Sequence, residues 1–145
     1  MKEMKKYEFC YVTSLQDTNV VGNIYFANFI AWQGKCREFF LKEKAPDILK
    51  KVEKNEIALI TLSCSCNYLG ELKAFDEVQI LLSLNKVEGN RITMEFEYFK
   101  IVEQIRKLVA TGTHEIGCFE RVNDELQPIP IPESLKLSLR EYQLQ

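Results

Sequence analysis

The clearest pattern in the chain is an alternation of apolar and polar residues over 91–103, where Ile92, Met94, Phe96 and Tyr98 stand on one side. A period of two is typical of a half-buried strand. Further runs rich in β-branched and aromatic residues predict strands over 7–13, 57–69, 77–87 and 107–120. Glu88-Gly89-Asn90 forms a compact turn signal between two of them. We expect the last four strands to follow one another as a meander.

One segment has helical spacing instead. Over 24–44, apolar residues fall at 25, 26, 29, 30, 32, 36, 39 and 40, which predicts a helix with a very wide apolar face. Asn23 is the expected N-cap and Pro46 the expected stop. Residues 47–55 form either a charged connection or a short second helix, and 133–144 predict a C-terminal helix. The order of elements predicts one α+β domain over 1–145, with an antiparallel sheet wrapped round one long helix that it largely encloses.

Composition and charge exclude several function classes. The net charge is −2 with Lys and Arg spread along the chain, which disfavours a nucleic-acid partner. No apolar run reaches the roughly 20 residues of a membrane span, and the first ten residues do not resemble a signal peptide. We therefore expect a cytoplasmic protein without a membrane partner. Five cysteines and a single histidine favour free, buried thiols over a metal site, and no cofactor is expected.

The segment 17–41, DTNVVGNIYFANFIAWQGKCREFFL, carries a family resemblance. It resembles the signature of the 4-hydroxybenzoyl-CoA thioesterase-like superfamily, whose members have the hotdog fold. Within that superfamily it looks closest to the thioesterases of enediyne polyketide pathways. The segments Ser63 to Cys66 and Ile92 to Tyr98 are also similar to that group. The resemblance implies hydrolysis of an acyl thioester.

Two departures from the superfamily pattern bear on the chemistry. Asn19 stands where typical members carry an Asp that acts as base or nucleophile, and an amide does neither near neutral pH. The enediyne group also looks to lack the acid there. Phe29 stands where relatives commonly have Tyr, so a phenol is missing from the expected channel.

The resemblance implies a site without a catalytic carboxylate. The backbone N–H near Phe26, at a helix N-terminus, would face the thioester oxygen, because such an end offers free N–H groups and a positive dipole. Arg37 would hold an acyl carbonyl or enolate oxygen, and Asn19 would position water. The expected substrate-binding residues are Gly22, Asn23, Tyr25 and Phe29.

Each assignment has a structural alternative. Asn19 can simply satisfy loop backbone groups, and Arg37 can pair with Glu38 or with a carboxylate such as Glu71 or Asp76. His114, at an alternating strand position, is expected to be a packed or surface residue.

The substrate implied by the resemblance is a β-ketoacyl, polyene chain on the acyl carrier protein of an iterative polyketide synthase. One alternative is a general acyl-CoA thioesterase, and a second is a non-catalytic acyl-binding hotdog protein. The resemblance also implies a homo-oligomer, either a dimer or a dimer of dimers such as a homotetramer. Unpaired sheet edges favour the same outcome.

Overall fold

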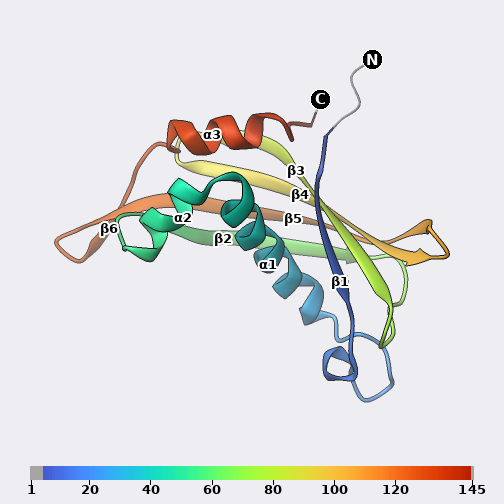
Figure 1. Ribbon diagram of the computed structural model, residues 1–145. Coiled ribbons are helices and arrows are strands. Elements are labelled where there is room, and N and C mark those ends of the chain that lie inside the picture. Colours follow the sequence, from blue (N-terminus) through green and yellow to red (C-terminus); the bar gives the residue numbers. More distant parts are fainter. Residues whose placement is uncertain (1–4, 145) are drawn as a thin grey trace.

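The β-rich segments form one antiparallel sheet in the computed structural model, which describes residues 5–144 (Figure 1). Its strands are β1 Tyr7–Val12, β2 Ala58–Tyr68, β3 Glu77–Glu88, β4 Arg91–Val102, β5 Ile105–Val122 and β6 Glu125–Pro128. The helices are a short 3-10 turn η1 Leu15–Asp17, the long α1 Ala27–Lys44, α2 Pro46–Glu53 and α3 Glu133–Arg140. The curled sheet with one long helix against it is the expected α+β hotdog architecture.

The four later strands do not form a simple meander. The order across the sheet is β1-β3-β4-β5-β2, with β6 paired to β5. Strands β3, β4 and β5 do follow one another, but β2 lies at the far edge, paired only with β5. The prediction was wrong on this point because β1, which precedes α1, already occupies the free edge of β3. As a result, one edge of β2 has no strand from residues 5–144 beside it.

Helix α1 begins three residues later than predicted. Asn23 and Ile24 are held in isolated β-bridges to Lys73 and Thr18, so their backbones are extended. The N-cap position is Phe26 rather than Asn23. Pro46 ends α1 as expected and also starts α2, because proline suits the first turn of a helix.

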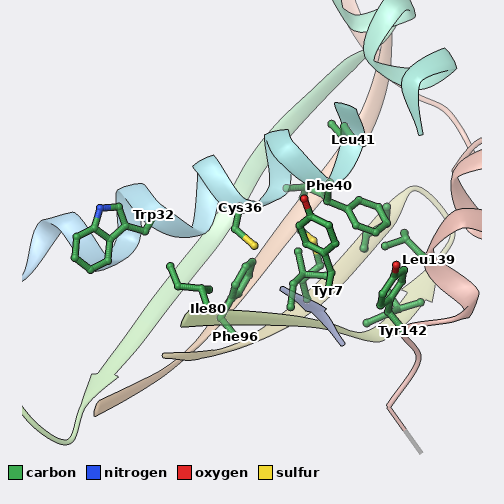
Figure 2. Close-up of a cluster of buried hydrophobic side chains, with 14 of the residues drawn as sticks. Tyr7, Trp32, Cys36, Phe40, Leu41, Ile80, Phe96, Leu139 and Tyr142 are labelled. Atoms are coloured by element: carbon green, nitrogen blue, oxygen red, sulfur yellow. The ribbon is translucent and has the colours of Figure 1, made fainter. Parts of the chain in front are cut away.

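The inner face of α1 packs on the sheet through Phe29, Trp32, Cys36 and Phe40, all at most 4% exposed. Figure 2 shows Trp32, Cys36 and Phe40 on α1, with Ile80 and Phe96 of the sheet among the buried side chains around them. Burying each large apolar side chain contributes roughly 1.5–3 kcal/mol. The sheet does not enclose the whole helix, however: Phe26 and Phe39 are 60% and 36% exposed. The apolar face predicted from the sequence is therefore wider than the face that this single chain covers.

Two smaller expectations were also wrong. Helix α3 ends at Arg140 instead of 144, because Tyr142 and Leu144 form backbone hydrogen bonds with Leu84 of β3. All five cysteines are free, as expected, but Cys10 and Cys64 are exposed rather than buried. Both lie on edge strands, where only one side of the strand is covered.

Candidate active site

The start of α1 presents backbone donors. The N–H groups of Phe26 and Ala27 donate to no acceptor among residues 5–144, whereas the Tyr25 N–H donates to the Asp17 carbonyl oxygen at 2.9 Å. The carbonyl of Phe26 accepts a 2.8 Å hydrogen bond from the Tyr68 hydroxyl, which ties this end of α1 to the end of β2. Free N–H groups at the positive end of an 18-residue helix are suited to stabilising a developing negative charge.

Asn19 shapes the loop that leads to these donors. Its side-chain oxygen accepts hydrogen bonds from the Val21 N–H at 3.0 Å and the Asn23 N–H at 3.2 Å. Asn19 therefore satisfies backbone groups of the loop, as the structural alternative for this residue predicts. With the oxygen occupied, the Nδ2 group of Asn19 can act only as a hydrogen-bond donor.

The other residues expected around the acyl group occupy different environments. Gly22 adopts a positive φ of 89° in the loop, which favours glycine, and Tyr25 is 46% exposed with its ring against Phe26. Phe29 is only 2% exposed and packs on Trp32 and other rings. In the single chain, Phe29 is thus a core residue. The side-chain amide of Asn28 donates to the Asp17 carbonyl oxygen of its own chain at 2.8 Å.

Arg37 lies in a partly buried polar cluster, in which His114 is buried and Thr61 is exposed, rather than in an ion pair. Its Nη1 is 3.3 Å from the Thr61 hydroxyl and 3.3 Å from His114 Nε2, and these two atoms are 3.1 Å apart. The cluster joins α1, β2 and β5. None of the ion pairs among residues 5–144 involves Arg37, and Asp76 pairs with Lys100 instead. Burial lowers the pKa of Arg37, opposed by the charge of Glu38.

His114 is the residue that sequence reasoning undervalued. It was expected to be either a packed or a surface residue, and it is buried at 3% exposed, but its contact with Arg37 was not predicted. Burial first, and the charge of Arg37 second, lower its pKa to about 4. The only available signal was that the single histidine shares one face of its strand with Gly112 and Ile116. No local sequence pattern indicates that Thr61 and Arg37 contact His114 on this face of the strand.

The depressed pKa of His114 predicts a pH-dependent stability. The folded pKa of about 4 lies below the unfolded value of 6.5, so the unfolded chain gains a proton first as the pH falls. The contribution of neutral His114 to the free energy of unfolding is fully present above pH 6.5 and is lost between pH 6.5 and pH 4. Denaturant titrations at pH 7 and pH 4 should show the wild type losing about 3 kcal/mol more than His114→Gln. Equal losses in the two proteins would contradict this assignment.

Helix α1 and strand β2 run side by side in opposite directions. Phe26 contacts Tyr68, the Gln33 amide donates to the Ser65 carbonyl at 2.9 Å, and Arg37 contacts Thr61. The eleven residues from Phe26 to Arg37 rise about 16 Å along a helix. The free N–H groups and the guanidinium of one chain are therefore too far apart to share one carbonyl group.

A cavity of about 360 Å³ opens beside Arg37, between α1, α2 and β2. Its apolar walls are formed by Phe39, Leu41, Leu49, Val52 and Leu59. The charged side chains of Arg37, Glu38 and Lys42 also line it. Apolar walls with a few charged groups suit an acyl chain that carries an oxygen function. Among residues 5–144, no group of three His, Cys, Asp or Glu side chains is placed to hold a metal ion.

Comparison with known families identifies the superfamily of this chain. The family model of the thioesterase-like superfamily matches residues 13–139. The chain belongs to that superfamily. It is accordingly a thioester hydrolase with a hotdog fold. No match was found among curated protein sequences.

Solved thioesterase structures share the whole architecture. The dynemicin thioesterase, known from a study of polyene binding, is 34% identical, with 97% of this chain and 99% of that chain covered at a TM-score of 0.92. A 1,4-dihydroxy-2-naphthoyl-CoA thioesterase from Synechocystis is 15% identical, with coverages of 94% and 96% and a TM-score of 0.82. A 4-hydroxybenzoyl-CoA thioesterase variant with its CoA substrate is 14% identical, with coverages of 92% and 98% and a TM-score of 0.82. The last two show likeness of fold only.

The thioesterase contains no helix among residues 5–144 that is long and apolar enough to cross a membrane.

Proposed function

We propose that this thioesterase releases a β-ketoacyl, polyene chain from the acyl carrier protein of an iterative polyketide synthase. The observation that carries the proposal is the pair of free N–H groups at the start of α1, in a site that offers no carboxylate at Asn19. The likeness to the dynemicin thioesterase, studied with a bound polyene, supports the choice of substrate. The apolar cavity beside Arg37 has the lining that such a chain requires.

The active site is composite and needs two copies of the chain. Strand β2 has 11 residues, ALITLSCSCNY, with neither charge nor proline to protect its free edge. If two such edges pair antiparallel, the Tyr68 end of one lies beside the Ala58 end of the other. The Phe26 N–H of one copy then approaches the half of α1 that holds Arg37 in its partner. The exposed Phe26 and Phe39 would be covered in the same dimer.

In this arrangement the two charge-stabilising groups act on one acyl group. The Phe26 N–H and its neighbour stabilise the oxyanion formed when water adds to the thioester carbonyl. Arg37 of the second copy holds the β-keto oxygen, and Asn19 Nδ2 donates a hydrogen bond that orients the water. The carbon–sulfur bond then breaks and the thiol leaves with a proton. No covalent acyl-enzyme forms.

Mixing two inactive variants tests the composite site. Arg37→Ala and Asn19→Ala are each expected to lose most activity alone. In a mixed dimer one of the two sites keeps both residues, so co-expression should restore about a quarter of wild-type turnover. If both residues served the site of their own chain, the mixed protein would stay inactive.

The substrate is tested by thiol release from matched acyl-carrier-protein and acyl-CoA thioesters. Faster turnover of the β-ketoacyl polyene on the carrier protein than of a saturated chain of equal length is the expected result. Equal or faster turnover of simple acyl-CoAs would point to a general acyl-CoA thioesterase. Binding without release of any thiol would point to a non-catalytic acyl-binding protein.

A further inference from the structure

The Arg37 cluster has a protonation state that its geometry fixes. A guanidinium can only donate hydrogen bonds, so His114 Nε2, 3.3 Å from Arg37 Nη1, must accept. The proton of a neutral imidazole therefore sits on Nδ1. Burial and the Arg37 charge keep the ring neutral by lowering its pKa to about 4. Thr61 completes the triangle, since its oxygen is within 3.3 Å of both partners.

Among residues 5–144, Arg37 is the one charged group whose field shifts the pKa of this histidine. Helix α1 contributes Arg37, β2 places Thr61 and Cys64 nearby, and β4 places Met94 opposite His114. The Phe96 ring lies 6.2 Å from the imidazole. The histidine thus has the Arg37 cation on one side and the side chains of Met94 and Phe96 beside it.

The cluster is also incomplete. Arg37 Nε and His114 Nδ1 are buried and have no hydrogen-bond partner among residues 5–144. A buried donor without an acceptor is destabilising. The second terminal nitrogen of Arg37 also makes no hydrogen bond within this part of the chain, and it is not buried, so it is available to an acceptor that the single chain does not contain. An acyl substrate with a second oxygen, enolate or keto, provides one.

We propose that His114 is a positioning residue, with Thr61 as its companion, that fixes the Arg37 guanidinium toward the second oxygen of the acyl substrate. The inference rests on the proposed function. It assigns a role to a histidine that takes no proton. His114 Nε2 holds Arg37 Nη1, which leaves the second terminal nitrogen of Arg37 for the substrate. Without the clamp, the long Arg side chain samples other rotamers and the oxygen is held less often.

A double-mutant cycle tests the clamp, using a β-ketoacyl carrier-protein thioester and a saturated one of equal length. His114→Leu should lower kcat on the β-keto substrate about 10- to 100-fold with little change in KM. On the saturated substrate, kcat should fall by less than about threefold. Arg37→Ala combined with His114→Leu should be no slower than Arg37→Ala alone, because His114 acts only through Arg37.

Conservative and control variants separate positioning from general disruption. His114→Gln keeps an acceptor and should retain most of the kcat, whereas Thr61→Val should show a smaller loss of the same kind. Met94→Leu, equally buried beside His114, should leave both rates unchanged. Additive losses in the double variant, or equal losses on the two substrates, would overturn the proposal. An inactive wild type would instead refute the proposed function itself.

Discussion

Arg37→Met is expected to make the protein more stable and nearly inactive. Methionine has a similar length and needs no hydrogen bonds, and the guanidinium it replaces is half-buried, with a buried Nε that has no hydrogen-bond partner among residues 5–144. The substitution leaves no new unpaired group, because the Thr61 hydroxyl can still donate to His114 Nε2 over 3.1 Å. Replacing such a half-buried charge by an apolar side chain should raise the free energy of unfolding by about 1–2 kcal/mol.

The loss of activity should be much larger than this gain in stability. A preorganised donor to a developing negative charge is worth about a hundredfold or more in kcat. Denaturant titration and thiol-release assays on the same preparation measure both effects. Arg121→Met, at an exposed arginine of β5, is the control and should change neither quantity appreciably. A destabilised Arg37→Met protein would show that the guanidinium stabilises the fold rather than serving the reaction.

Gly112→Ala is expected to give the largest loss of stability. A Cβ atom at Gly112 would lie 2.2 Å from Gln33 Nε2 and 2.7 Å from the carbonyl oxygen of Ser65. Gln33 is fully buried and donates to that same carbonyl oxygen, so α1, β2 and β5 meet at this point. Separating them and leaving the Gln33 amide unpaired should cost about 3 kcal/mol or more, measured by chemical denaturation.

A second glycine, Gly34, provides a control for which the expected change in stability has the opposite sign. A Cβ at Gly34 of α1 meets nothing within 4 Å, so Gly34→Ala should stabilise the helix by up to about 1 kcal/mol. Gln33→Ala combined with Gly112→Ala should recover only part of the loss, since the contact with the Ser65 carbonyl remains. Wild-type stability in Gly112→Ala would mean that α1 does not pack closely on β5.

The cluster of Arg37, Thr61 and His114 shows how much a local sequence pattern can predict. The spacing of apolar residues identified α1 and placed Arg37 on it, and the family resemblance singled out Arg37 and Asn19. The alternating pattern placed His114 on a strand but left open whether it is packed or at the surface, and the structure places it on the buried face. The sequence pattern could not predict that Thr61 lies beside Arg37 and His114. That contact depends on the pairing of β2 with β5 at the far edge of the sheet.

The start of α1 shows a second limit. Asn23 has a good N-cap side chain, but its backbone is bridged to Lys73, some 50 residues further along the chain, and the helix begins only after Phe26. A long-range backbone contact overrode a local preference. The correction matters for function, because the free N–H groups are those of Phe26 and Ala27.

The sequence by itself determined the element types, the long apolar helix, the missing carboxylate at position 19 and the family. These follow from residue chemistry and from periods of two and 3.6, which are local properties of the chain. The tertiary structure decided which strands are neighbours, which edge stays free and which polar groups lack partners. Those outcomes depend on how the whole sheet closes round α1, because burial and hydrogen bonding there join residues that are distant in sequence.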